Sequence, residues 1–177
     1  MANAEQLEYL QDSADDWNIY RREHAITQPD LSEANLSAAE LPGADLSGAD
    51  LARADLRAID LTNANLANAD LTGANLSGAF LLNVVLSGAN LTGADLTGAN
   101  LTEVNAVNAI LTNATLSGAM LGRANLTNAI LHQADLGGAN LTSATLLQAD
   151  LTEANLADVN LSRADLTGVI GLNLSGR

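Results

Sequence analysis

The chain has 177 residues, and its 21 acidic side chains against seven arginines, with no lysine, give a formal net charge of −14. This charge argues against direct binding to nucleic acid, and a chain without lysine cannot form a glycine-rich phosphate loop with its lysine. There is no cysteine, which excludes disulfides and thiolate metal sites, and no apolar run approaches the about 20 residues of a membrane span.

Residues 1–29 do not follow the repeat that begins after them. They predict one amphipathic helix over Ala4–Glu23, whose apolar positions recur at helical spacing: Leu7, Leu10, Ala14 and Trp17. Arg21 and Arg22 stand near its C-terminus, where they suit the helix dipole. We expect the helix to cap the open end of the following structure through Leu7, Leu10 and, as the main anchor, Trp17. A partner-binding or membrane helix is the alternative, although the acidic residues disfavour a membrane.

From residue 30 to residue 170 a leucine recurs at every fifth position. It occupies 27 of the 28 central positions from Leu31 to Leu166, and Ala106 is the exception. Most centres have a small apolar residue two positions before them, and Asp or Asn directly precedes the centre in 20 of 28 units. Ser or Thr follows it in 17 of 28 units, often with Gly next, as in Ser47 and Gly48.

A period of five fits neither a helix nor a flat strand, so the chain must turn once per unit to bring every leucine to a common interior. Leucine and the small residue two before it give the alternation of a short extended side, and Ser, Gly and Asn form the corner. Corners near a right angle predict coils of twenty residues, and two charge pairs separated by twenty residues support this: Glu33 with Arg53 and Glu103 with Arg123. The five-residue period alone is also compatible with a three-sided coil of fifteen residues.

The repeat resembles pentapeptide-repeat proteins in the run Ala44-Asp45-Leu46-Ser47-Gly48-Ala49-Asp50-Leu51. The resemblance covers about residues 30–170 and implies an all-β fold, a right-handed quadrilateral parallel β-helix with an N-terminal α-helical cap. At four units per coil, the 28 units make about seven coils. We therefore expect a cap and linker over 1–29, the β-helix over 30–170 and a tail over 171–177.

The stretch 17–22 resembles the lead-in to the repeats of some cyanobacterial members, which implies a bacterial, cyanobacterial source. The N-terminus lacks a charged segment followed by an apolar stretch, so no intact signal peptide is expected. The expected location is the cytoplasm, and the periplasm or thylakoid lumen is the alternative if a signal peptide was removed.

After Leu166 the pattern decays, and no second helix follows. Either this tail folds over the last coil or two molecules meet there. We favour the first interpretation and expect a monomer, with a C-terminal end-to-end dimer as the alternative.

Several outward positions between residues 80 and 147 are unexpectedly apolar. At twenty residues per coil, Ile110 and Ile130 stack on one face, and Phe80 and Met120 share another, two coils apart. Further examples are Leu82, Val85, Val107 and Leu147. A contiguous apolar patch indicates a contact surface, but residues spread over several faces favour drift on a tolerant scaffold. If there is a protein contact, we expect it first at Ile110 and Ile130 and second at Phe80 and Met120.

Asp30, Asp50 and Asp70 are also expected to stack, and such a carboxylate ladder is a candidate calcium site. The favoured interpretation is that Asp and Asn here bond the nearby backbone. We expect no metal and no cofactor.

Catalysis has little support, because His24 and His132 are far apart in the sequence and neither belongs to a motif. The sequence predicts a non-enzymatic structural or protein-interaction solenoid with an unidentified protein partner. The alternative follows from the resemblance, since some pentapeptide-repeat proteins are DNA mimics that act on DNA gyrase. Residues 30–170 hold 15 acidic residues and four arginines, and the acidic residues are concentrated between residues 30 and 70. Against a DNA mimic, this chain has leucine at the central positions where the gyrase-directed members tend to carry phenylalanine.

Overall fold

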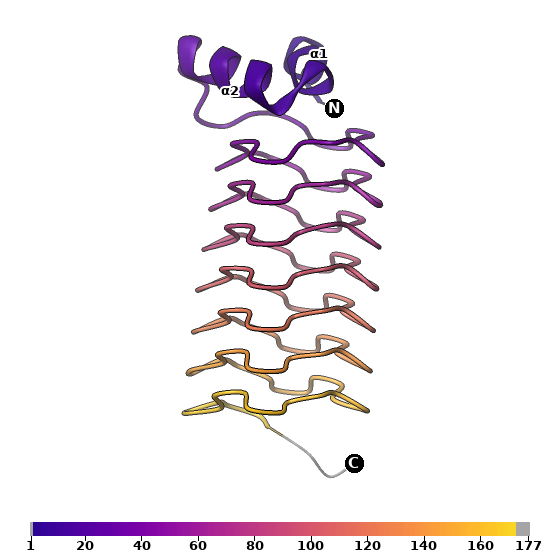
Figure 1. Ribbon diagram of the computed structural model, residues 1–177, viewed down its shortest axis with the longest axis vertical. Helices are drawn as coiled ribbons and strands as arrows, with labels where there is room; N and C mark the ends of the chain where they lie inside the picture. Colours follow the sequence, from indigo (N-terminus) through magenta and orange to yellow (C-terminus); the bar gives the residue numbers. More distant parts are fainter. Residues whose placement is uncertain (1, 173–177) are drawn as a thin grey trace.

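The computed structural model describes residues 2–172, apart from the side chain of Asp12. Two short helices, α1 and α2, cover one end of a stack of coils, and the chain descends coil by coil to its C-terminus at the other end (Figure 1). Most of the tail, for which we expected a fold over the last coil, lies outside the described residues.

The N-terminal segment forms two helices, α1 (Ala4–Asp12) and α2 (Ala14–Glu23), so the prediction of one continuous helix is wrong. Ser13 lies between them with an extended backbone, at φ −170° and ψ 163°. Its Oγ accepts a hydrogen bond from the Asp16 N–H at 3.0 Å and donates one to the Asp16 carboxylate at 2.7 Å. Serine is among the best residues for this position, because its side chain satisfies an N–H that the first helical turn leaves free. The chain therefore starts a second helix at Ser13.

The coils contain twenty residues each, because parallel β-bridges join residues twenty apart from Asp30–Asp50 to Asp150–Ile170. These bridges exclude the alternative of a three-sided coil of fifteen residues. Each coil has four bridge positions, such as 30, 35, 40 and 45, and therefore four sides. The 28 units make seven coils at four units per coil. Each side is a single bridge residue long, so the stack is held by many short ladders rather than by long strands.

Every corner is a tight turn closed by the carbonyl of the central residue, which is leucine in all units but that of Ala106. In the first unit the Ala34 N–H donates to the Leu31 carbonyl at 3.1 Å, and the third turn residue, Glu33, has φ +59°. A β-turn with this left-handed third residue favours Gly and tolerates Asn. The repeat supplies them at most corners, as at Asn63 (φ +61°) and Gly73 (φ +65°).

The core is a column of inward leucines with small residues between them. Leu61 and Ala64 are typical, since both are fully buried. Ala106 is buried as well, and the inward residue two before it, Val104, is larger than the usual alanine. In the last coil the burial weakens, and Leu161 and Leu166 are only half-buried within the part of the chain that is described.

Candidate functional site

The Asp and Asn residues on the outer sides support the turns. Each of the 20 that precede a central residue accepts a hydrogen bond from the backbone N–H two positions later. At Asp45, Oδ1 accepts from the Ser47 N–H at 3.1 Å and from its hydroxyl at 2.8 Å. The prediction that these side chains bond the nearby backbone is confirmed. The hydroxyls of Thr152 and Thr167, and to a lesser extent their backbone N–H groups, lower the pKa of Asp150 and of Asp165.

Asp30, Asp50 and Asp70 lie in one column, as their twenty-residue spacing predicts. Within residues 2–172, however, no group of three or more His, Asp or Glu side chains is placed to hold a metal ion. In each of the three aspartates Oδ1 is directed to its own turn, where it accepts a backbone N–H.

Two ion pairs join neighbouring coils at the predicted twenty-residue spacing. Arg53 Nη2 lies 2.5 Å from Glu33 Oε1, and Arg123 Nη1 lies 3.0 Å from Glu103 Oε1. The guanidinium of Arg53 lowers the pKa of Glu33 through a hydrogen bond and its charge. All four side chains are exposed, so each pair contributes little to stability.

The cap bonds backbone groups that a preceding coil would otherwise satisfy. In the interior of the stack, the N–H and C=O of each bridge residue both bond to the preceding coil, as Asp50 does to the Pro29 carbonyl and the Leu31 N–H. The first coil has no coil above it. There the Asn3 N–H donates to the Asp30 carbonyl at 2.8 Å, and Gln6 Oε1 accepts from the Asp30 N–H at 2.9 Å.

Trp17 and Asn18 of α2 do the same at Asp45. Trp17 Nε1 donates to the Asp45 carbonyl at 2.8 Å, and Asn18 Oδ1 accepts from the Asp45 N–H at 2.7 Å. Trp17 is fully buried, as is Leu10, whereas Leu7 is half-buried against the core. All three residues that the sequence assigned to the cap therefore lie at or near the junction of the helices with the first coil.

The sequence analysis did not predict the polar cap residues Asn3, Gln6 and Asn18, nor the role of Arg21 in the cap. Arg21 is 8% exposed, and its guanidinium donates to the carbonyls of Asp45 at 2.6 Å, Ser47 at 2.5 Å and Ile26 at 2.9 Å. Nη1 also lies 3.3 Å from Asp45 Oδ1. The signal was available, because Arg21 follows Trp17 by four residues and therefore shares its helix face. We had assigned it only to the helix dipole.

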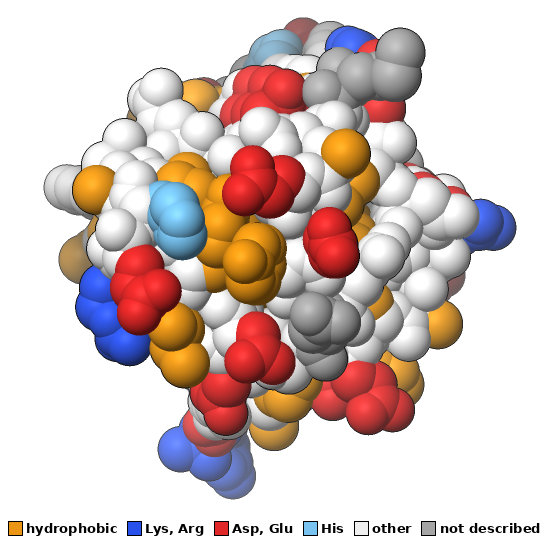
Figure 2. Space-filling view, turned by 90° about the horizontal axis from the view of Figure 1, so that it is seen from above, with side chains coloured by type: hydrophobic (Ala, Val, Ile, Leu, Met, Phe, Trp, Pro, Cys, Tyr) orange, Lys and Arg blue, Asp and Glu red, His pale blue; other side chains and the backbone are white. Residues whose placement is uncertain are grey.

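An open hollow on the outer side of the cap gathers aromatic and acidic side chains. Seen from this end, hydrophobic side chains and a histidine lie at the centre, with Asp and Glu around them (Figure 2). The lining residues are Tyr9, Asp16, Ile19, Tyr20, Glu23 and His24.

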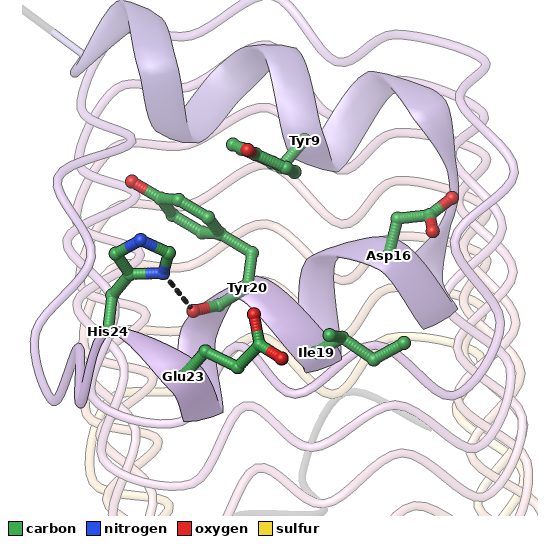
Figure 3. Close-up of a pocket in the computed structure, with 6 residues that line it drawn as sticks. All are labelled: Tyr9, Asp16, Ile19, Tyr20, Glu23 and His24. Carbon is green, nitrogen blue, oxygen red and sulfur yellow. Dashed lines mark hydrogen bonds between the residues drawn. The ribbon is translucent and has the colours of Figure 1, made fainter.

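The polar groups of this hollow are tied to the helices. Tyr20 stacks on Tyr9 with ring centroids 3.9 Å apart, and its ring centroid is 4.3 Å from that of His24 (Figure 3). His24 Nδ1 donates to the Tyr20 carbonyl at 2.9 Å, and the Asp16 carboxylate accepts from Ser13. Burial and the nearby Glu5 raise the pKa of Tyr20. His132, the other histidine, follows Ile130 on the solenoid, far from this end.

Of the four predicted contact residues, the structure brings two together. Ile110 and Ile130 are bridge partners in adjacent coils, and Ile130 is 41% exposed while Ile110 is half-buried. Phe80 and Met120 are 52% and 45% exposed, but Asn100 lies between them in their column. Only the isoleucines are in adjacent positions.

Two further apolar residues extend the isoleucine pair. Val107 and Leu147 are forty residues apart and therefore occupy the same corner, two coils apart, which leads into the column of Ile110 and Ile130. Both are half-buried. We call Val107, Ile110, Ile130 and Leu147 the isoleucine strip.

The same column is acidic toward the cap. It runs through Asp30, Asp50, Asp70 and Asn90 to Ile110 and Ile130, and it continues beyond them to Asp150 and Ile170. We call the three aspartates the aspartate ladder. One face of the solenoid thus carries negative charge on the first three coils and apolar side chains on the fifth and sixth bridge positions.

The five-residue unit and the coils of twenty residues define a solenoid class. A family model described as pentapeptide repeats matches the chain in eight copies over residues 30–66, 64–102, 94–133 and 134–170. The chain belongs to the pentapeptide-repeat family, whose members form right-handed β-helices. The two N-terminal helices fit a cap on such a β-helix.

Solved structures similar to this chain include two cyanobacterial proteins. HetL, a pentapeptide-repeat protein involved in heterocyst differentiation regulation in Nostoc sp. strain PCC 7120, is 30% identical over 90% of this chain and 97% of its own, with a TM-score of 0.49. Rfr23 from Cyanothece 51142 is 29% identical over 86% of this chain and 96% of its own, with a TM-score of 0.35. QnrB1, a plasmid-mediated fluoroquinolone resistance protein, is 23% identical over 80% of this chain and 76% of its own, with a TM-score of 0.41.

A comparison with curated proteins finds no match. Among residues 2–172, neither helix has the length and apolar character needed to cross a membrane.

Proposed function

We propose that this protein is a non-enzymatic interaction solenoid that binds another protein through the isoleucine strip. Pentapeptide-repeat proteins are in general structural or interaction proteins, which supports the class. The observation that carries the surface is the direct bridge between Ile110 and Ile130, at positions where 20 of 28 units have Asp or Asn.

Isoleucine at these positions has a cost to the scaffold. An Asp or Asn would accept the N–H two residues later, and a typical hydrogen bond of this kind contributes about 0.5–1.5 kcal/mol. Ile110 and Ile130 give up this bond, and Ile130 also exposes 41% of its surface. Val107 and Leu147 place two more apolar side chains in outward slots beside them. Adjacent apolar side chains on the surface, such as Ile110 and Ile130, are typical of a protein contact.

The distribution of acid disfavours the alternative of a DNA mimic that acts on DNA gyrase. Such a mimic needs a continuous acidic stripe, since duplex DNA carries one charge per about 1.7 Å. Here one column alternates Asn35, Asp55, Asn75 and Asp95, and another has no acid between Asp45 and Asp165. A patchy surface supports the interaction solenoid. If a micromolar excess of this protein inhibits DNA supercoiling by gyrase or protects gyrase from inhibition, the DNA-mimic function replaces the proposed interaction solenoid.

The proposal is tested with the variant Ile110→Asn/Ile130→Asn. Asparagine is the residue that the repeat itself uses at these positions, so the coil should keep its fold and its unfolding midpoint. We expect a partner crosslinked to wild type in an extract of the source organism to be lost, by about tenfold or more. The matched control is Phe80→Asn/Met120→Asn, which removes two exposed apolar side chains from another face and should leave the crosslink intact. Equal crosslinking of wild type and the isoleucine variant would overturn the proposal.

A further inference from the structure

We infer that the partner of this face is an amphipathic helix, basic at one end and apolar at the other, which lies along the solenoid axis over the aspartate ladder and the isoleucine strip. The inference rests on the proposed function and adds the chemistry of the partner. Its starting point is that Asp30, Asp50, Asp70, Asn90, Ile110 and Ile130 form one uninterrupted column of bridges.

The charge of the ladder is available to a partner. Each aspartate engages Oδ1 in its own turn, with the N–H of Ser32, Ala52 and Thr72 respectively. Within residues 2–172 no ion pair to these three carboxylates is formed, and Asp50 and Asp70 are exposed. Lys or Arg side chains of a partner are the groups that would complement them.

A second copy of this chain cannot supply that positive charge. The chain has no lysine. Among its six described arginines, Arg21 is buried in the cap, and three more are held by acidic neighbours: Arg53, Arg57 and Arg123. The other two, Arg22 on α2 and Arg163 in the last coil, are exposed but lie at opposite ends of the molecule, so together they cannot face three stacked carboxylates. Two copies meeting through this face would therefore bring no matching positive charge to the aspartate ladder. The complementary surface must therefore come from a different protein.

The spacing of the column matches one face of a helix. Neighbouring coils are about 4.8 Å apart, so the column from Asp30 to Ile130 spans about 24 Å in five steps. A helix rises 1.5 Å per residue, so steps of three and four residues advance about 4.5 and 6 Å and stay on one face. An extended strand repeats on one face every about 6.6 Å and would fall out of step within two coils.

This match defines the partner's pattern. Residues at about positions 1, 4 and 8 of an 18-residue helix would meet the aspartate ladder, and those at about 15 and 18 would meet Ile110 and Ile130. The first three should be Lys or Arg and the last two Leu or Ile, with a polar residue opposite Asn90.

The test uses a fluorescently labelled helical peptide with this pattern and full-length protein, with binding followed by anisotropy. We expect saturable binding that Ile110→Asn/Ile130→Asn weakens by about tenfold and Asp50→Asn/Asp70→Asn by about threefold to tenfold. Asparagine keeps the Oδ1 acceptor of the aspartates, so the turns stay bonded. The effect of the aspartate variant should shrink at about 0.5 M salt, because exposed charges are then screened.

The controls separate this column from the rest of the surface. Asp95→Asn removes an acid, and Met120→Asn an exposed apolar side chain, from other faces. Neither should change the affinity. A peptide of the same composition with its basic and apolar residues scrambled should bind at least tenfold more weakly.

The inference is overturned if wild type binds the scrambled peptide equally well, if Asp50→Asn/Asp70→Asn has no effect at low salt, or if the patterned peptide does not bind. If the peptide fails while the crosslinked partner is still lost in Ile110→Asn/Ile130→Asn, the proposed function stands and only the helical, basic nature of the partner is wrong.

Discussion

At each corner of the solenoid the third turn residue has a positive φ. The free-energy cost of this left-handed conformation depends on the residue type. Glycine adopts it freely and asparagine tolerates it, but Ala38 and Ala58 hold φ +56° and +53°. An L-residue with a Cβ pays a steric cost in this region. Most corners meet this backbone requirement with Gly or Asn, and the remaining corners hold other residues with a Cβ, the two alanines among them.

We predict that Ala58→Gly stabilises the protein by about 0.5–1 kcal/mol, because relief of left-handed strain exceeds the entropy that glycine adds to the unfolded chain. The measurement is urea unfolding at equilibrium. The control is Ala52→Gly, at a turn position whose φ is not positive, which should be neutral or destabilising. A gain in both variants would show that the conformation of residue 58 is not the cause.

The second residue-scale prediction concerns Asp150, whose pKa is lowered chiefly by the Thr152 hydroxyl at 2.5 Å and by the Thr152 N–H at 2.9 Å. Thr152→Val removes the hydroxyl donor and should raise the pKa of Asp150 toward the usual about 3.9. Since the folded pKa lies below the unfolded one, the stabilisation is present above about pH 4 and disappears as the pH falls through the folded pKa. A carboxyl-detected NMR titration measures the shift, and an unchanged pKa contradicts the assignment.

At the scale of the elements, α1 and α2 act as a substitute for a coil. Asn3, Gln6, Asn18 and Trp17 bond backbone groups of Asp30 and Asp45 that would otherwise face solvent or another molecule. Because the helix breaks at Ser13, Gln6 of α1 bonds Asp30, and Trp17 and Asn18 of α2 bond Asp45. An end with free ladder groups invites end-to-end association, so the cap also limits polymerisation.

We predict that Arg21→Ala destabilises the protein by about 2–4 kcal/mol, because the carbonyls of Ile26, Asp45 and Ser47 lose a charged donor in a buried setting. The matched control is the adjacent Arg22→Ala, which is exposed and should stay within about 0.5 kcal/mol of wild type. Urea unfolding measures both, and hydrogen exchange should rise first in residues 31–50. Equal effects of the two variants would contradict a capping role for Arg21.

At the scale of the whole molecule, stability should depend on position along the stack. Each coil contacts only its neighbours, so a terminal coil has half the support of an internal one. The cap supplies the missing half at the N-terminus. At the other end, the described inter-coil ladder ends with the bond from the Leu151 N–H to the Ile170 carbonyl, and Leu161 and Leu166 are half-buried.

We therefore predict that amides of residues 152–170 exchange with deuterium faster than those of the central coils, and that the first coil is as protected as the centre. Hydrogen-exchange mass spectrometry at low protein concentration measures the gradient. Uniform protection would contradict an open C-terminal end. If protection there rises with protein concentration, a second molecule covers this end.

The sequence by itself determined the repeating part of this protein. A leucine every fifth residue, with Asp or Asn before it and a turn residue after it, defines which side chains face inward, and Glu33 with Arg53 indicated the number of residues per coil. This succeeds because the same short-range pattern is repeated 28 times, so local errors average out. The stacking of Ile110 on Ile130 followed from the same arithmetic.

Only the tertiary structure decided what does not repeat. The helix break at Ser13, the burial of Arg21 and the bonds from Trp17 to Asp45 depend on one junction between the cap and the first coil, which no periodic pattern encodes. The structure likewise placed Val107 and Leu147 at the corner that leads into the column of Ile110 and Ile130, because this placement depends on a coil that closes after twenty residues.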